Sequence, residues 1–188
     1  MTDKKQQIID SAEKLIAESG FQGLSMHKLA KEAGVAAGTI YRYFSDKEDL
    51  LLQVRLAVIK RNAEVVQRGV DDSMSLKQRF RTMWLNTFDL SGDNICNLKN
   101  RAQYDSLPCV RNHETKEIER KMFYKVDQLF TEGRNSGLFK PLDNPILAAL
   151  SLEVSVMLAR KQSLGYYQLD QEAIDAAIEA SWDAIIQH

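Results

Sequence analysis

The sequence predicts an all-α fold of about nine helices. Apolar residues recur at helical spacing along the whole chain, and no segment shows the sustained alternation that is typical of strands. Glycine or proline stands at several of the breaks between periodic segments, where it ends helices. With 188 residues, 44% of them hydrophobic, the chain is long enough for one large core or two smaller ones. We expect an N-terminal domain over residues 1–48 and a larger helical domain over residues 49–188.

Three short helices are expected in the first 44 residues. The first runs from about Asp3 to Ser19, and Gly20 is placed to end it in the left-handed conformation. The second begins after Ser25, which is its predicted N-cap, and Gly34 stops it. The third follows directly and contains the sequence Thr-Ile-Tyr-Arg-Tyr-Phe.

A long fourth helix is expected from Ser45 to about Arg68. Ser45 is the predicted N-cap, and Glu48 lies three residues further on, which is the spacing of a capping box. Apolar residues at helical spacing continue through this segment, so the helix joins the two predicted domains.

Five apolar stripes predict the helices of the larger domain. Gly137 and Pro141 separate the third stripe from the fourth, and Gly165 separates the fourth from the fifth. The stripes are Leu76, Phe80, Met83, Trp84 and Phe88; Ile95, Leu98 and Ala102; Ile118, Met122, Val126 and Leu129; Leu147, Leu150, Val154 and Leu158; and Ile174, Ile178, Trp182 and Ile185.

The third helix carries the most informative pattern. Residues 41–44, Tyr-Arg-Tyr-Phe, cannot all face one core, because successive helical residues point about 100° apart. Ile40 and Phe44 are four residues apart and are expected to hold this helix onto its neighbours. Gly38 lets the protein backbone come close to a phosphate. The polar side chains of this segment are then available to a partner outside the core, and they are Thr39, Tyr41, Arg42 and Tyr43. Two short helices joined at a glycine and braced by a third are the layout of a helix-turn-helix, whose second helix enters the major groove of DNA.

The stretch GLSMHKLAKEAGVAAGTIYRYFSDKEDLL resembles the signature of the TetR/AcrR transcriptional regulators, and the match covers about residues 8–52. The resemblance implies a homodimeric repressor that binds a palindromic operator in double-stranded DNA. It also implies that the C-terminal domain binds a small-molecule inducer. By the same resemblance the phosphate-contacting positions are Ser25, Tyr41 and Lys47, and the positions near bases are Thr39, Arg42 and Tyr43. We select Arg42 for base readout, because a guanidinium can make a bidentate contact to guanine.

The chain departs from the family pattern at Ala36 and Ala37, where a serine or threonine cap followed by a basic or polar residue is common. Loss of a side-chain cap costs a helix about 1 kcal/mol. We therefore expect a weaker operator complex, or compensation from Lys4, Lys5 and the fourth helix. Net charge adds little evidence for DNA binding. Residues 1–68 hold 11 basic and 9 acidic side chains, and such a small excess is as compatible with an ordinary solvated surface as with a DNA-binding one.

Two sets of residues in the larger domain are candidates for further sites. Small side chains on the last two predicted helices allow close helix approach, so these helices are expected to form the dimer interface, with packing inside one chain as the alternative. The interface candidates are Leu150, Val154, Leu158, Ile174, Ile178, Trp182 and Ile185. The candidates for an inducer pocket, each of which also suits an ordinary core, are Trp84, Phe88, Arg101, Tyr104, Met122, Phe123 and Phe130.

Several other classes of protein are disfavoured. The sequence has no phosphate-binding glycine loop, nucleophile elbow or metal-ligand pair, so no enzymatic activity, metal or cofactor is expected. Cys96 and Cys109 are interpreted as small thiols, with a redox or electrophile sensor as the alternative. No apolar run approaches the roughly 20 residues needed to span a bilayer, so a cytoplasmic protein without membrane contact is expected. Two alternative functions stay open: a DNA-binding protein of this fold with a protein effector or an architectural role, and a helical small-molecule-binding protein or enzyme.

Overall fold

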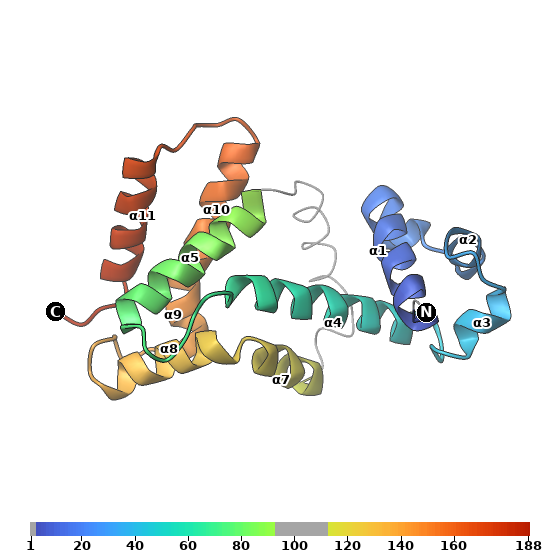
Figure 1. Cartoon of the computed structure of the whole chain (residues 1–188), viewed down its shortest axis with the longest axis horizontal. Coiled ribbons are helices and arrows are strands. Elements are labelled where there is room, and N and C mark those ends of the chain that lie inside the picture. The colour runs from blue at the N-terminus through green and yellow to red at the C-terminus, as the bar shows by residue number, and fades with distance from the viewer. Residues whose placement is uncertain (1–2, 93–112) are drawn as a thin grey trace. The chain divides into compact units, whose positions relative to one another are not determined.

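The structure is a computed structural model that describes residues 3–92 and 113–188 (Figure 1). Within these ranges the regular elements are helices, and the only β-type pairing is an isolated bridge between Phe139 and Ile186. The all-α fold class is thereby confirmed. The chain forms two compact units: unit 1 contains the described residues up to Arg61 together with 113–119, and unit 2 contains residues 62–92 and 120–188. No helix in the described part of the chain is both long and apolar enough to span a bilayer.

Unit 1 contains α1 (Lys4–Gly23), α2 (Met26–Glu32), α3 (Ala37–Tyr41) and the first part of α4 (Lys47–Val66). Gly20 has a φ of 68°, so the regular part of α1 ends there as expected, and one further turn follows it. The core of unit 1 is a single apolar cluster to which all four helices contribute; its fully buried members include Ile8, Ala12, Ile16, Leu29, Ile40, Leu50 and Val54.

The start of α4 differs from the expected capping box by one residue. The helix begins at Lys47, and the Asp46 carboxylate accepts a hydrogen bond from the backbone N–H of Asp49 at 2.8 Å. The Asp49 carboxylate accepts from the backbone N–H of Ser45 at 2.9 Å. The capping pair is therefore Asp46 and Asp49 and not Ser45 and Glu48. The two pairs have the same spacing, and the observed pair lies one position further along the chain.

Unit 2 contains α5 (Leu76–Gly92), α8 (Tyr124–Asn135), α9 (Asn144–Leu150), α10 (Leu152–Ser163), α11 (Gln171–Asp183) and the end of α7 (His113–Met122). Helix α5 packs against both α10 and α11 (Figure 1). Aromatic rings fill the core: Trp84 stacks on Phe88 at 5.5 Å between centroids, and Phe139 meets the Trp182 ring edge-on at 5.2 Å. The indole N–H of Trp84 donates to Ser181 Oγ, so the polar atom of this buried ring is satisfied.

Two of the predicted helices are each divided in two. The stripe from Ile118 to Leu129 is broken at Phe123, which has a φ of −93° and a ψ of 36° and separates α7 from α8. The stripe from Leu147 to Leu158 is broken at Ser151, which is fully buried and separates α9 from α10. The predicted stripe of Ile95, Leu98 and Ala102 lies outside the described residues.

Candidate nucleic-acid interface

Helices α2 and α3 are joined by a tight turn built on local backbone geometry. Gly34 follows α2 with a φ of 61°, a conformation that glycine adopts without strain. The Ser25 hydroxyl accepts from the backbone N–H of Lys28 at 3.2 Å, so the predicted N-cap of α2 is present. Ala36 precedes α3 and makes no side-chain cap, as the sequence implies. Helices α2 and α3 are therefore joined by a short turn through Gly34, and α3 has no side-chain cap of its own.

The third helix is shorter than expected: α3 ends at Tyr41, and Arg42, Tyr43 and Phe44 follow it in a turn. Helix α3 and this turn bury two side chains and expose the polar ones between them. Ile40 and Phe44 are 0% and 1% exposed in the core of unit 1. Tyr41 and Tyr43 are 56% and 40% exposed, which is unusual for residues with so much apolar area. Arg42 is exposed as well. The spacing thus separates the anchoring residues from a surface of two phenols and a guanidinium, as the sequence predicts.

Gly38 lies inside α3 although the fold does not require a glycine there. A β-carbon at this position would meet no atom within 4 Å in the described structure, and its φ lies outside the left-handed region. Glycine inside a helix costs roughly 1 kcal/mol relative to alanine. Nothing in the described structure therefore accounts for a glycine at this position.

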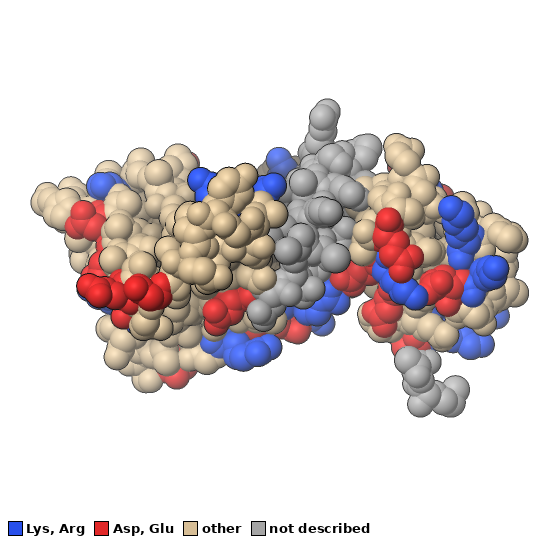
Figure 2. All heavy atoms as spheres, turned by 90° about the horizontal axis from the view of Figure 1, so that it is seen from above, with Lys and Arg blue, Asp and Glu red and all other residues tan. Residues whose placement is uncertain are grey.

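The basic side chains of unit 1 fall into two groups. Lys14 is paired with Glu32 at 2.6 Å, and Lys47 Nζ donates to the backbone carbonyl of Phe21 at 3.3 Å. Lys28 and Lys31 of α2 are exposed, and no hydrogen bond or ion pair of their side chains occurs among the residues the structure describes. On the face of the molecule drawn in Figure 2, basic and acidic side chains are interspersed and do not form one large field of a single sign.

Sequence reasoning missed Lys28 and Lys31 as candidate phosphate contacts. Both lie on α2, and Lys28 is only three residues after Ser25, which was already expected to lie near phosphate. Their position after an N-cap in the first helix of the motif could have indicated them. Lys47, which was expected to contact phosphate, uses one of its three N–H donors on the Phe21 carbonyl, and that bond leaves two donors.

The residues expected at an inducer pocket are only partly brought together. Trp84 and Phe88 are buried in the core of unit 2 and stack on each other. Phe123 and Phe130 line a hollow next to α9, while Met122 is not among its lining residues. Arg101 and Tyr104 lie outside the described residues, as do Cys96 and Cys109. In the described residues no group of His, Cys, Asp and Glu side chains could hold a metal ion.

Some of the residues expected at a dimer interface are buried in the core of unit 2, and others are partly or fully exposed. Ile178, Trp182 and Ile185 belong to the core of unit 2. Leu158 and Ile174 pack partly against that core, and Val154 is half-buried. Leu150 is exposed. Large apolar side chains that were not predicted for an interface are exposed on and after α10, namely Met157, Leu164 and Tyr166.

A fixed turn between two short helices, with a tyrosine and arginine face on the second, defines a helix-turn-helix DNA-binding protein. Comparison with known proteins agrees. Residues 8–54 match the family model of bacterial regulatory proteins of the tetR family, and residues 75–186 match that of the tetracyclin repressor-like C-terminal domain.

Individual relatives and a solved structure agree with the family models. The chain is 35% identical to an uncharacterised HTH-type transcriptional regulator of Haemophilus influenzae, with 98% of this chain and 96% of that protein covered. It is 30% identical to the fatty acid metabolism regulator protein of Bacillus subtilis, over 73% of this chain and 71% of that protein. A solved TetR family transcriptional regulator from Vibrio parahaemolyticus has 66% identity and a TM-score of 0.91, covering 99% of this chain and 100% of that one. The chain therefore belongs to the TetR family, and it is a DNA-binding transcriptional regulator.

Proposed function

We propose that this chain is a homodimeric repressor that binds a palindromic operator and is released from it by a small organic ligand. The observation that carries the proposal is the division of α3 and the turn after it into buried Ile40 and Phe44 and an exposed face of Tyr41, Arg42 and Tyr43. In this proposal residues 1–48 read the DNA, and residues 49–188 dimerise and bind the effector.

Each residue of the reading surface has a proposed task. Arg42 makes the bidentate contact to a guanine, with Thr39 and Tyr43 near neighbouring bases. Ser25, Tyr41 and Lys47 contact phosphates, and Gly38 admits the DNA backbone. To these we add Lys28 and Lys31, whose exposed ammonium groups on α2 suit phosphate contacts.

The dimer follows from the geometry of DNA recognition and from the surface of unit 2. One α3 helix reads one half-site, so a palindromic operator needs two copies related by a two-fold axis. We place the interface on the outward faces of α10 and α11, where Met157 and Leu164 are exposed together with Ala176 and Ala180, which are four residues apart. The buried residues Ile178, Trp182 and Ile185 would support this surface from inside the core.

Release by a ligand would act as a shift between two conformations of the dimer. A ligand weakens DNA binding only by the difference in its affinity for the two conformations. Helix α4 is the proposed connection, because it contributes residues to unit 1 and to unit 2. The effector is proposed to be amphipathic, and a screen should include fatty acids because the Bacillus subtilis relative is named for fatty acid metabolism.

The proposal is tested by fluorescence anisotropy against duplexes tiled across the DNA upstream of the gene, with random duplex as the control. We expect one tile to bind about a thousandfold or more tightly than random DNA, with two chains or a multiple of two per site. Met157→Glu should give monomers in analytical ultracentrifugation and weaken operator binding. Equally weak, salt-dependent binding to every duplex would argue against a specific operator in that region.

A further inference from the structure

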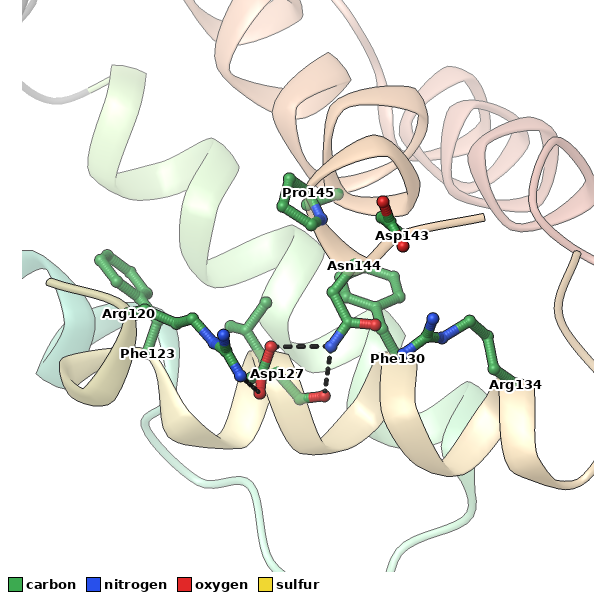
Figure 3. A pocket seen from close by; sticks show the side chains of 10 residues that line it. Arg120, Phe123, Asp127, Phe130, Arg134, Asp143, Asn144 and Pro145 are labelled. Carbon is green, nitrogen blue, oxygen red and sulfur yellow. Dashed lines mark hydrogen bonds and ion pairs between the residues drawn. The ribbon is translucent and has the colours of Figure 1, made fainter. Parts of the chain in front are cut away.

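Two helices of the described structure, α4 and α7, contribute residues to both compact units. The division falls within the second half of α4 and within the last turn of α7. In unit 2 two contacts fix the end of α7. Gln67, one residue after α4, donates to the Met122 carbonyl at 2.9 Å, and Arg120 pairs with Asp127 of α8 at 3.3 Å (Figure 3). In unit 1 the rest of α7 is held in another way, by an ion pair to α4.

The ion pair joins Glu119 of α7 to Arg55 of α4. Arg55 Nε lies 2.6 Å from Glu119 Oε1, and Arg55 Nη2 lies 3.1 Å from Glu119 Oε2. The arginine side chain is 6% exposed and the glutamate side chain is 18% exposed, so both charges are largely removed from water. Two parallel hydrogen bonds between a guanidinium and a carboxylate fix the angle between the groups as well as their separation. The pair therefore sets the orientation of α7 on α4 at this point.

Apolar packing contributes little to holding this part of α7. Residues 113–119 contain one large apolar side chain, Ile118, which is 40% exposed. Thr115 is buried, but it offers a single methyl group. Among the residues that the structure describes, the apolar cluster of unit 1 includes no member of α7. The ion pair, rather than an apolar contact, therefore fixes α7 to α4 in unit 1.

Stability alone does not account for such a pair. Removing two charges from water offsets much of their attraction, and a buried ion pair can often be replaced by apolar side chains without loss of stability. An apolar contact does not define an angle in the same way, so the gain from the pair is a fixed orientation. Helix α4 makes a second contact of this kind, because Arg61 bonds to both carboxylate oxygens of Glu13 in α1, at 3.2 and 2.5 Å. Two-point contacts thus join α4 to α7 and to α1.

We propose that Arg55 and Glu119 are positioning residues for DNA recognition, and that neither contacts DNA. The ion pair holds α7 against α4, so that α1, α2 and α3 keep one orientation relative to the rest of the chain. In a two-fold dimer this orientation sets the separation of the two copies of α3, which must match half-sites about one helical turn, or 34–36 Å, apart. This inference rests on the proposed function for the dimer and the palindromic operator, whereas the holding of α7 by the ion pair depends on neither.

The first measurement needs no operator. Spin labels are attached to cysteines introduced by Ala17→Cys in α1 and Asn135→Cys in α8, both exposed positions, in the full-length protein with Cys96 and Cys109 replaced by serine. Pulsed EPR gives the distribution of the distance between the labels, with excess unlabelled protein present so that distances within one chain dominate. Glu119→Gln should broaden this distribution, because an amide has one acceptor oxygen and no charge.

Two further variants separate positioning from stability. Glu132→Gln is the matched control, because Glu132 pairs with an arginine whose side chain is likewise buried, Arg79, and both residues belong to unit 2. It should lower stability without broadening the distance distribution. Glu119→Asp keeps the charge but is one methylene shorter, so it should give intermediate broadening, and it replaces Glu119→Gln if that variant does not fold.

DNA binding supplies the second readout. Anisotropy compares the operator with a duplex that has one base pair inserted at its centre, which moves the half-sites about 3.4 Å further apart and rotates them by about 34°. The wild type and Glu132→Gln should bind the altered duplex much more weakly than the operator. Glu119→Gln should bind the operator more weakly than the wild type does and lose several-fold less on insertion, with random duplex bound as before. Loss of folded protein alone would lower both affinities by the same factor.

A broader distance distribution together with a smaller insertion penalty in Glu119→Gln would support the inference. An unchanged distribution in Glu119→Gln, or equal broadening in Glu119→Gln and Glu132→Gln, would overturn it. Broadening with the insertion penalty of the wild type would overturn the role in DNA recognition. Absence of any specific operator would count against the proposed function, and the label distances would still decide whether the ion pair holds α7 and α4 together.

Discussion

The ring of Phe139 lies against the Cα of Gly133, in the space that a β-carbon at position 133 would occupy. The backbone N–H groups of Leu138 and Phe139 both donate to the Gly133 carbonyl, at 2.9 and 3.0 Å. Phe139 is almost completely buried and contacts the rings of Phe130 and Trp182. The turn after α8 therefore packs directly against Gly133. The Phe139 ring in turn contacts Phe130, which lines the hollow next to α9.

Gly133→Ala should lower the free energy of unfolding by about 1–3 kcal/mol, because the added methyl group forces the Phe139 ring out of its place in a packed core. Urea denaturation followed by circular dichroism measures the change. Gly92→Ala is the control: its β-carbon would meet nothing within 4 Å, and its φ is not in the left-handed region. Equal loss of stability in both variants would contradict this account of Gly133.

Gly38→Ala should separate stability from DNA binding. Alanine in α3 is expected to raise the free energy of unfolding by roughly 0.5–1 kcal/mol, because nothing in the protein opposes its methyl group. The same methyl group should weaken operator binding by occupying space that the DNA backbone needs. Thermal denaturation and anisotropy on one preparation measure both effects. Unchanged operator affinity would remove Gly38 from the proposed interface.

The sequence was most informative where the pattern is local. The exposure of Tyr41 and Tyr43 between buried Ile40 and Phe44 follows from helical spacing, which the hydrogen bond from the Phe44 N–H to the Ile40 carbonyl continues past the end of α3. The division of α7 from α8 at Phe123 was not predictable in this way. The Met122 carbonyl and the Lys125 N–H, which lie on either side of the break, bond to Gln67, more than 50 positions away in the sequence. Gln67 Nε2 donates to the Met122 carbonyl at 2.9 Å, and Gln67 Oε1 accepts from the Lys125 N–H at 2.7 Å.

Arg134 Nε and Asn144 Oδ1 are buried and have no hydrogen-bond partner among the described residues, and the sequence did not predict this for a related reason. In the sequence Arg134 lies near the predicted end of a helix and Asn144 lies next to Pro145, and neither arrangement is unusual. The sequence does not show that the Asn144 amide is oriented by Asp127 and Thr131, since these residues lie on another helix. Their significance depends on which atoms are buried, and burial is a property of the folded chain.

Gln67→Leu should destabilise the protein by about 1–3 kcal/mol, because the Met122 carbonyl and the Lys125 N–H then lose their side-chain partner at the break between α7 and α8. Gln171→Leu is the control, since Gln171 is exposed and, among the residues that the structure describes, its amide bonds only to Asp175 on the same helix. It should change stability by less than about 0.5 kcal/mol. Similar midpoints for the two variants in urea would show that Gln67 does not stabilise the break.

Glu132 should make stability depend on pH. Hydrogen bonds from Arg79, at 2.5 Å, and from Gln128, at 2.7 Å, lower the pKa of the Glu132 carboxyl below its usual 4.5. A lowered folded-state pKa contributes stability that is present above the unfolded value and is lost as pH falls through the folded one. The effect is modest, because the side chain is 40% exposed.

The measurement compares the wild type with Glu132→Gln in urea at a series of pH values. The wild type should be the more stable protein at pH 7, and the difference should shrink as the pH falls below about 4.5. A difference that stays constant between neutral and acid pH would show that the charge of Glu132 does not contribute through Arg79.

Arg42→Ala and Lys47→Ala should affect DNA binding in different ways. Arg42 is the exposed C-cap residue of α3, and its loss should relax the preference at one or two base pairs by about 1–3 kcal/mol while random DNA binds nearly as before. Lys47 presents charge beside the carbonyl of Phe21, and its loss should weaken binding to all sequences and make the salt slope shallower by about one unit. Anisotropy with operator, single-base variants and random duplex at several salt concentrations separates the two effects. If both substitutions weakened operator and random DNA equally, Arg42 would be a phosphate contact and base readout would have to come from Thr39 or Tyr43.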